Sequence, residues 1–421
     1  MEAYILEWLN LLLRWTHLIV GIAWIGSSFY FVWLDLNLNV PPRDPEDEAV
    51  AGDLWAVHGG GFYHAQKYRV APGELPEPLH WFKWEAYTTW LTGFALLVLI
   101  YYLNAEVYLI DKAVADITPF MAIATSIGLL LASWIGYDLL CRSGLSDSRI
   151  ALLGFLLLAV VVYLVSHLFS GRGAYIQIGA MLGTIMVANV FFVIIPGQRE
   201  LVRAKQRGEE PDPLPGLRGK QRSVHNNYLT LPVLFVMLSP HYPITYAHEY
   251  NWLLLIVIFS AGALIRHFFN LKNQGRPTPV LVIIALLLLG LAAFIAIPKS
   301  ASESTPTSVS NPAPESISAS ADAPQQAATT QARAPVSFAE VREVITQRCN
   351  ICHSATPNHP TAPVAPRGIM FDTPEQIRQW TKRIHASTVT SKTMPLANLT
   401  QITEEERELI ARWYQAGAPV E

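Results

Sequence analysis

Charged residues are scarce in this chain. Asp, Glu, Lys and Arg make up 15% of its 421 residues, and hydrophobic residues make up 51%. A soluble domain typically carries about 25% charged residues, so the composition excludes an ordinary soluble protein. The formal net charge of −3 gives no reason to expect a nucleic-acid partner. The apolar excess is concentrated before residue 298, which predicts a membrane domain over residues 1–298.

Cysteine is equally rare, and a basic N-terminal leader is missing. Three cysteines exclude a disulfide framework. Cys141 stands alone beside an expected membrane helix and is interpreted as a small buried thiol, with a functional thiol as the alternative. The start carries Glu2 and Glu7, and the first apolar run is too long for a signal peptide. We therefore expect a retained first span.

Long apolar runs predict an all-α, eight-span helical bundle. A membrane-crossing helix needs about 20 apolar residues. The segments that qualify are 9–35, 84–104, 117–140, 150–169, 174–196, 224–240, 251–271 and 278–297. The sixth is the weakest, because Pro232 and Pro240 favour a kinked or partly re-entrant segment.

The distribution of Lys and Arg predicts the orientation. Fifteen of them lie in the loops that follow spans 1, 3, 5 and 7, against Lys112 and Arg172 in the other loops. Loops rich in Lys and Arg face the cytoplasm. We therefore expect a multi-pass membrane protein, embedded in the lipid bilayer, with both termini outside the cytoplasm.

Residues 299–335 consist mainly of Ser, Ala, Pro, Thr and Gln. Such a segment has too few large apolar side chains to form a core, so we expect a disordered linker. Residues 336–421 have a globular composition again and are expected to form a separate domain.

The run Cys349-Asn350-Ile351-Cys352-His353 matches the CxxCH signature of haem attachment. Two thiols one helical turn apart can bond to the two vinyl groups of one porphyrin edge, and His353 then reaches the iron. A zinc site is the alternative, but zinc prefers four ligands and no second cysteine pair exists. The sequence predicts one covalent haem c outside the cytoplasm.

The second iron ligand is expected to be Met394, which precedes Pro395 in a loop between two expected helices. Ligation by His353 and Met394 raises the haem potential, which suits an electron acceptor. The other candidates are Met370, which we interpret as core packing, and two histidines, His359 and His385.

Three capping boxes predict three helices around this haem: Ser337 with Glu340, Thr373 with Gln376, and Thr403 with Glu406. This domain resembles the class I cytochrome c family in its N-terminal helix, CxxCH segment, Met-Pro loop and C-terminal helix. The resemblance implies a pure electron-transfer role.

The first cytoplasmic loop contains HGGGFYHAQKY and LHWFKWEAYTTW. Glycines let a ligand approach the backbone, aromatic rings stack, and Lys or Arg balances negative charge. This predicts a site for a flat anion, with an interfacial aromatic belt as the alternative. The expected roles are base for His58 and His64, charge partner for Lys67, Lys83 and Arg69, and stacking for Tyr63 and Trp81.

Polar residues inside the expected spans are further candidates. His225 and Asn226 open span 6 on the cytoplasmic side and are expected to bind substrate, although polar helix ends often have no such role. His17 and His167 lie in the outer half of spans 1 and 4. Intramembrane histidines are functional candidates, so a haem b between them is one prediction and interhelical hydrogen bonding is the alternative.

The two runs above, with HNNYLTLPVLFVMLS and RWTHLIVGIAWIGSSFYFVWLD, resemble the membrane-bound bacterial urate hydroxylase (urate oxidase) family. That family joins an eight-span urate oxidase domain to a C-terminal cytochrome c. The resemblance implies a protein of the bacterial inner membrane, with its cytochrome domain on the periplasmic side. It also implies oxidation of urate to 5-hydroxyisourate in purine degradation, without peroxide. Electrons would leave through the haem to a respiratory cytochrome c oxidase or a soluble cytochrome c.

Two alternatives stay open. One is a dehydrogenase for a quinol or another heterocycle, and the other is a membrane-anchored cytochrome that is not an enzyme. A cytoplasmic urate site also raises a distance problem, because electrons would have to cross about 30 Å of hydrocarbon to reach a periplasmic haem.

Overall fold

A computed structural model describes residues 2–39, 50–112, 114–297, 336–358, 365–366, 369–390 and 392–420. The chain divides into two compact units, residues 1–296 and 297–421. Each unit has a hydrophobic core of its own. The expected linker, residues 299–335, lies outside the described residues.

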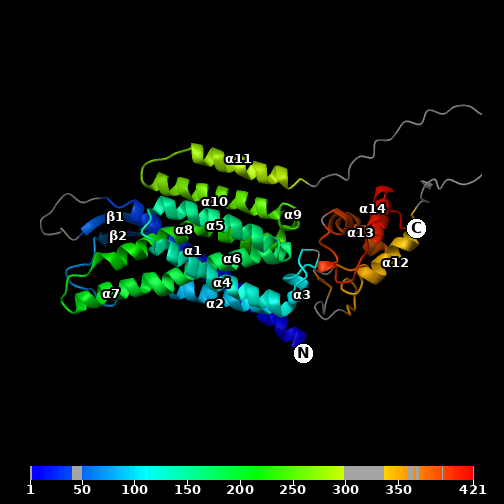
Figure 1. The fold of residues 1–421 in the computed structure, drawn as a ribbon, viewed down its shortest axis with the longest axis horizontal. Helices are drawn as coiled ribbons and strands as arrows, with labels where there is room; N and C mark the ends of the chain where they lie inside the picture. The colour runs from blue at the N-terminus through cyan, green and yellow to red at the C-terminus, as the bar shows by residue number, and fades with distance from the viewer. Residues whose placement is uncertain are drawn as a thin grey trace, which may run out of the picture. The chain divides into compact units, whose positions relative to one another are not determined.

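Unit 1 is a bundle of roughly parallel and antiparallel helices (Figure 1). Helical segments cover all eight of the expected spans. They are α1 (Glu2–Leu36), α2 with η2 (Trp84–Leu96, Leu97–Tyr102), α4 (Pro119–Arg142), α5 (Asp147–Ser166), α6 with η3 and α7 (Gly171–Ala188, Asn189–Ile194, Ile195–Gln206), α8 (Pro213–Leu238), α10 (Asn251–Asn273) and α11 (Val280–Ile295). Short helices α3 (Ala105–Tyr108), η4 (Ser239–His241) and α9 (Pro243–Tyr246) lie in the connections.

Within the described part, five helices are long and apolar enough to cross a membrane: Tyr4–Leu36, Pro119–Arg142, Asp147–Ser166, Gly171–Gln206 and Asn251–Asn273. Unit 1 is therefore a multi-pass membrane unit. Helix α11 is apolar but shorter. Helix α8 begins with a basic stretch, and α2 changes to π-helix after Leu96. That all eight segments cross the membrane stays a prediction.

Helix α6 occupies the centre of the bundle and is buried along most of its length. A methyl group at Gly179 would lie 2.7 Å from Cγ1 of Val236 in α8, so only glycine permits this approach. Small residues at such contacts let membrane helices pack closely. The close contact of α6 with α8 positions the polar side chains of α8 that are described below.

The expectation of an all-α fold is wrong in one place. Strands β1 (Val50–His58) and β2 (Gly61–Tyr68) pair as an antiparallel hairpin, with His58 opposite Gly61. Gly59 and Gly60 form the turn with φ values of +57° and +82°. Two residues with positive φ match the twist of a tight hairpin, which explains glycine at both positions without a ligand.

Gly52 fixes this hairpin against the end of α1. A methyl group there would lie 2.8 Å from Cβ of Leu38 and 2.9 Å from the carbonyl oxygen of Asn39. Asn39 and Asp53 also exchange backbone hydrogen bonds of 2.8 and 3.0 Å. The strand therefore needs glycine at this crossing.

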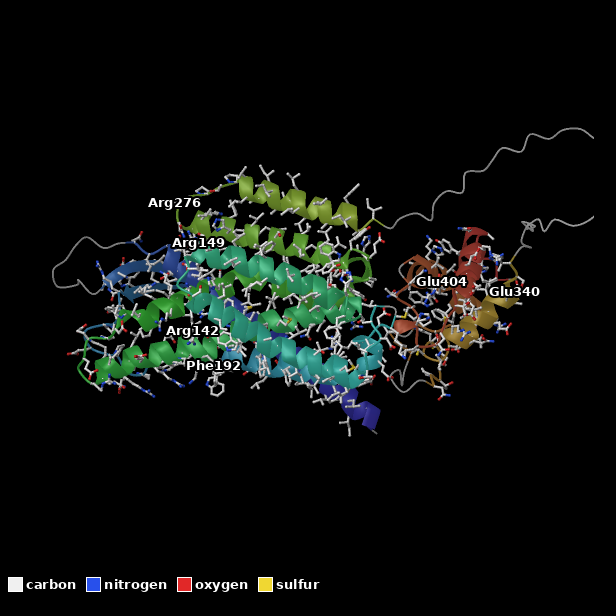
Figure 2. All side chains as sticks on the ribbon, viewed as in Figure 1. Arg142, Arg149, Phe192, Arg276, Glu340 and Glu404 are labelled. Atoms are coloured by element: carbon white, nitrogen blue, oxygen red, sulfur yellow. The ribbon has the colours of Figure 1, made fainter. Side chains whose placement is uncertain are left out.

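Arginines gather at the end of the bundle that carries the hairpin. Figure 2 shows Arg142, Arg149 and Arg276, from three different segments, at this end. The grouping agrees with the expectation that these loops share one side of the membrane.

Unit 2 contains α12 (Phe338–Arg348), α13 (Pro374–His385), η6 (Ala386–Thr390), η7 (Leu396–Asn398) and α14 (Glu404–Gln415). The three predicted capping boxes are confirmed, because each N-cap side chain and each N3 side chain bonds to the backbone of the other. Phe338 of α12 stacks on Trp413 of α14 with ring centroids 6.2 Å apart. This contact lies in the core of the unit.

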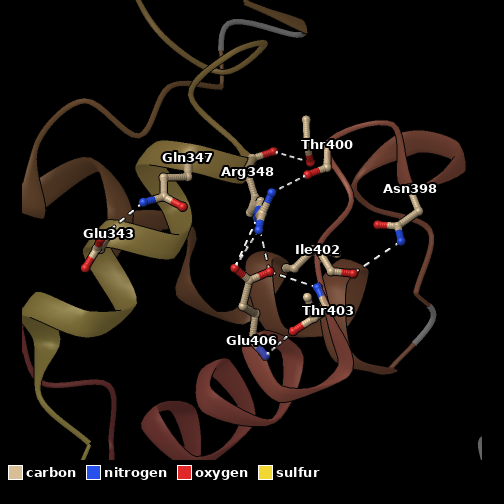
Figure 3. Close-up of polar contacts among 8 residues, drawn as sticks. All are labelled: Glu343, Gln347, Arg348, Asn398, Thr400, Ile402, Thr403 and Glu406. Carbon is tan, nitrogen blue, oxygen red and sulfur yellow. Dashed lines mark hydrogen bonds and ion pairs between the residues drawn. The ribbon is translucent and has the colours of Figure 1, made fainter.

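Arg348, which precedes Cys349, ties the end of α12 to the start of α14 (Figure 3). Its Nε lies 3.1 Å from both carboxylate oxygens of Glu406, and its Nη1 donates to the Thr400 carbonyl over 2.8 Å. The Thr400 hydroxyl returns a 2.8 Å bond to the Arg348 carbonyl. These bonds hold the backbone at which the CxxCH segment begins.

Candidate functional site

A cavity of about 640 Å³ lies at the hairpin end of unit 1. Ligand sites typically enclose roughly 300–1,000 Å³. Its walls come from α1, α6, η3, α7 and α8, from the end of β2, and from the segment that joins β2 to α2. The lining residues are Trp24, Ile25, Ser27, Ser28, Phe31, Tyr68, Val70, Ala71, Pro72, Leu75, Pro76, Leu79, His80, Trp81, Phe82, Met186, Val190, Ile194, Gln198, Leu201, Val202, Ser223, Asn226 and Thr230.

The lining combines aromatic rings with neutral hydrogen-bonding groups. Trp24 and Trp81 pack against the same small core, and Phe31 meets Phe82 edge to face with centroids 4.9 Å apart. Among these residues, which all belong to the described part, there is no Asp, Glu, Lys or Arg, and His80 is the one histidine. The cavity suits a planar ring that accepts and donates hydrogen bonds.

Asn226 is held in a fixed orientation. Its Oδ1 accepts a 2.8 Å bond from Nδ2 of Asn189, and its Nδ2 donates to the Met186 carbonyl over 2.9 Å. Asn189 also donates to the Tyr137 hydroxyl over 3.2 Å. An amide nitrogen has two protons, so one N–H of Asn226 is left for a ligand. Asn226 can therefore donate to a carbonyl or ring nitrogen in the cavity.

Of the residues expected to bind substrate, Trp81 and Asn226 line this cavity together. His225 does not, because its Nδ1 lies 2.8 Å from the Tyr137 hydroxyl and 3.8 Å from Sγ of Cys141. Tyr63 lies on the hairpin and is 55% exposed.

The two expected bases lie on the hairpin, outside the cavity lining. His64 bonds to Asp53 over 2.7 Å and stacks on Trp55 with centroids 4.3 Å apart. A strand rises about 3.3 Å per residue, so His64 is roughly 13 Å along β2 from Tyr68, which lines the cavity. His58 lies opposite Gly61, roughly 23 Å along the strand from Tyr68. Neither imidazole is brought to the cavity.

Two of the three expected charge partners contact other side chains. Lys67 contacts Asp35 at the end of α1, and Lys220 of α8 reaches the same carboxylate over 2.9 Å. Burial and the Lys220 ammonium lower the pKa of Lys67 to about 8, although Asp35 favours the charged form. Lys83 lies 5.6 Å from the Trp84 ring centroid, and Arg69 is exposed. None of the three lines the cavity.

The two outer histidines have different neighbours. Nδ1 of His17 lies 3.0 Å from the Thr89 carbonyl and 3.0 Å from the Thr92 hydroxyl of α2. Nδ1 of His167, just after α5, lies 2.8 Å from the Tyr163 carbonyl. Helix α1 packs mainly on α2, whereas α5 packs mainly on α10 and α6. These surroundings favour interhelical hydrogen bonding for His17 and give no support to a haem shared with His167.

In unit 2, the CxxCH segment has the chemistry that haem attachment needs. Cys349 and Cys352 are free thiols. Nδ1 of His353 lies 3.0 Å from the Ile369 carbonyl, and a proton on Nδ1 that donates there leaves Nε2 as the free ligand atom. Across the described residues, no group of three or more His, Cys, Asp or Glu side chains converges as a metal site. Cys349, Cys352 and His353 therefore fit a covalently attached haem.

The candidates for the second iron ligand differ in their surroundings. Met394 is 38% exposed, and its carbonyl accepts a 2.9 Å bond from Arg407, which steadies the loop. Met370 is half-buried beside buried Ile369 and Phe371. His385 stacks on Tyr414 with centroids 4.1 Å apart. His359 lies outside the described residues. Of these candidates, Met394 has the most accessible side chain, and its loop is held by Arg407. It is therefore the best placed to bind the haem iron.

Sequence reasoning missed His80, Ser28 and Thr230 as cavity residues. His80 stands beside Trp81 in the run LHWFKWEAYTTW, so its neighbours gave a usable signal. Ser28 and Thr230 gave none, because single hydroxyl residues are common in membrane helices.

The comparison with protein families gives one match. The model of the urate oxidase N-terminal family matches residues 3–297, which include the whole cavity. No curated protein and no solved structure was found to match. Because the match covers well over half of the chain, the protein belongs to the urate oxidase N-terminal family.

Proposed function

We propose that the cavity binds urate and that the chain oxidises it to 5-hydroxyisourate, with the electrons passed to the respiratory chain through a haem c in unit 2. Membership of the urate oxidase N-terminal family implies an oxidoreductase and points to urate. The single observation that supports the location is the cavity of about 640 Å³, which Trp24, Trp81 and Asn226 line together.

The reaction consumes urate and water and yields 5-hydroxyisourate, two protons and two electrons. Indole faces hold a purine ring by stacking, and the free N–H of Asn226 donates to a ring carbonyl. His80, the histidine of the lining, would take a proton from the attacking water or the ring. A positioned histidine contributes about 10²–10⁴-fold to such a step.

Cys349 and Cys352 would hold the haem covalently, with His353 and Met394 as the iron ligands. Such a group accepts electrons one at a time and passes them to a cytochrome or an oxidase. The chain's own contribution is to fix the attachment segment, through Arg348 and Glu406 at its start and the Ile369 carbonyl behind His353.

The proposed topology has eight spans with both termini on the periplasmic side. The cavity then opens at the cytoplasmic end, and the haem lies across about 30 Å of hydrocarbon. A haem b near His17 and His167 would shorten the gap, but their surroundings do not favour it. Haem reduction is therefore the step to measure, because urate consumption alone does not report electron exit.

The test is anaerobic mixing of the purified full-length protein with urate, followed by haem absorbance and product analysis. We expect haem reduction and 5-hydroxyisourate in a ratio of two electrons per product. Reduction by a quinol or another heterocycle, and not by urate, would point to the alternative dehydrogenase. If only dithionite reduces the haem, the protein is a membrane-anchored electron carrier and not an enzyme. If the protein carries no covalent haem but still oxidises urate, the proposed electron route through the haem is wrong and the urate oxidase function stands.

A further inference from the structure

A second buried asparagine contacts Asn226 of the cavity lining. Asn189 is the first residue of the π-helical segment η3, and its side chain is fully buried. The segment η3 packs against α8, the helix that carries Asn226. π-Helical turns interrupt the regular hydrogen bonds of a helix and are frequent at functional sites. Asn189 does not line the cavity itself, so any effect that it has on a ligand passes through its neighbours.

The hydrogen bonds of the two asparagines have one possible direction. The Met186 carbonyl can only accept, so the Asn226 atom that lies 2.9 Å from it is Nδ2. Oδ1 of Asn226 then faces Asn189 and accepts a 2.8 Å bond from its Nδ2. Met186 and Asn226 both line the cavity, so this direction is set at the cavity wall.

Asn189 is held in turn by Tyr137 of α4. The second N–H of Asn189 donates to the Tyr137 hydroxyl over 3.2 Å, and the same hydroxyl lies 2.8 Å from Nδ1 of His225. Oδ1 of Asn189 is buried and has no hydrogen-bond partner within the described part of the chain. Asn189 therefore acts through its two N–H groups, as a donor to Asn226 on one side and to Tyr137 on the other.

This arrangement prevents the amide of Asn226 from turning over. A reversed amide would place its oxygen against the Met186 carbonyl and its nitrogen against Nδ2 of Asn189. A buried polar group without its partner costs about 1–3 kcal/mol, so the reversed state is disfavoured at both contacts. The free group of Asn226 is therefore an N–H. A fixed donor pairs with a carbonyl oxygen and disfavours an amino group at the same ring position, where two donors would meet.

We propose that Asn189 is a positioning residue that sets the ligand specificity of the cavity. Through Asn226 it selects a planar heterocycle with carbonyl oxygens, such as an oxopurine, over one with amino groups at the same ring positions. Asn226 donates to a carbonyl oxygen of the ring, and Asn189 fixes the direction of that bond without touching the ligand. The identity of the ring as urate rests on the proposed function, whereas the preference for oxo over amino heterocycles does not.

The test is titration calorimetry on the purified full-length protein, reduced with dithionite and kept anaerobic so that urate is not consumed. Asn226→Ala should weaken urate binding roughly ten- to a hundredfold, because it removes the donor. Asn189→Leu should weaken it less, because the donor remains but is no longer held. In an Asn226→Ala background, Asn189→Leu should cause no further loss, since it acts only through Asn226.

A pair of related ligands separates this role from a structural one. In diaminopurine, amino groups replace both ring oxygens of xanthine. The wild type should prefer xanthine, and Asn189→Leu should reduce that preference, because a released Asn226 can turn its oxygen toward an amino group. A structural defect would weaken both ligands and keep their ratio. Tyr137→Phe, which removes the hydroxyl that holds Asn189, should act in the same direction and serves if Asn189→Leu does not fold.

The matched control is Gln177→Leu, which removes a buried amide of α6 that bonds to Ser126 and lies outside the cavity lining. It should leave the preference for xanthine unchanged. Wild-type preference and affinity in both Asn189→Leu and Tyr137→Phe would overturn the proposal, and so would a full further loss in the double variant. If urate does not bind but xanthine binds through Asn226 and Asn189, the positioning role stands and the urate function fails.

Discussion

Nε2 of His64 on β2 lies 2.7 Å from Oδ2 of Asp53 on β1. A carboxylate on one ring nitrogen fixes the orientation of a histidine, as in many catalytic pairs. This pair nevertheless lies on the exposed hairpin, and the cavity has a histidine of its own, His80. Geometry therefore separates two candidates that residue type alone cannot rank.

We expect His80→Ala to lower the rate of urate-dependent haem reduction by about 10²–10⁴-fold, because it removes the proposed base. His64→Ala and His58→Ala should stay within about threefold of the wild type, since neither lines the cavity. The measurement is stopped-flow haem absorbance, with His241→Ala at the other end of the bundle as a control. Wild-type rates in His80→Ala, with a severe loss in His64→Ala, would return the active site to the hairpin.

Lys67→Met tests whether Lys67 holds the substrate anion. The pKa of Lys67 is about 8, so raising the pH through that value removes its charge. If Lys67 bound urate, the affinity of the wild type would fall through this range and Lys67→Met would abolish the fall. Because its ammonium is engaged with Asp35, we expect no such inflection in urate affinity.

The same pKa gives the sign of a stability effect. The unfolded chain keeps Lys67 protonated up to its ordinary pKa near 10.5, whereas the folded chain releases the proton near 8. Between these values the unfolded state binds more protons, so the contribution of Lys67 to stability rises with pH. Thermal unfolding should show this rise in the wild type, and Lys67→Met should flatten it.

Cys349→Ala or Cys352→Ala should remove the covalent haem stain of the full-length protein on a denaturing gel, because each thiol would form one thioether. Cys141→Ala should leave the stain unchanged, since this thiol lies beside His225 in unit 1. Full staining of both Cys349→Ala and Cys352→Ala would exclude this segment as the attachment site.

Met394→Ala should remove the thioether-to-iron band at long wavelength and lower the haem potential. Met370→Ala is the matched control and should preserve the band, because Met370 sits beside core residues. Redox titration of both variants measures the shift. A band that disappears in Met370→Ala and persists in Met394→Ala would reverse the assignment.

Arg348→Ala should destabilise unit 2 by about 2–3 kcal/mol, since it leaves Glu406 half-buried without its charged partner. Gln347→Ala, which loses only an exposed bond to Glu343, should cost no more than about 0.5 kcal/mol. Hydrogen exchange of α12 and α14 in the intact protein measures both changes. Equal protection in the two variants would contradict a bracing role for Arg348.

Helices and caps were predictable from the sequence because their signals are local. A capping box needs only residues three positions apart, and all three of them formed as predicted. The hairpin was missed although its signals were present: two short runs rich in aromatic residues flank the glycines that form its turn. The triple glycine was interpreted as a ligand site, and turn chemistry is the simpler explanation.

The cavity could not be predicted, because its walls come from segments as distant as Trp24, Trp81, Gln198 and Asn226. Only packing reveals that Asn226 faces the cavity while its neighbour His225 faces Tyr137. The motifs that contain cavity residues could be recognised in the sequence. Which residues of each motif point into the cavity could not.

The joined helix of α6, η3 and α7 has 36 residues, Gly171–Gln206. At about 1.5 Å per residue its contour is roughly 54 Å, whereas the hydrocarbon layer is about 30 Å thick. Its final turns, which supply Gln198 and Leu201 to the cavity, therefore extend beyond the lipid chains. We therefore expect a dissolved anion to reach the cavity without partitioning into the bilayer, and urate turnover to follow the aqueous concentration on that face of the membrane.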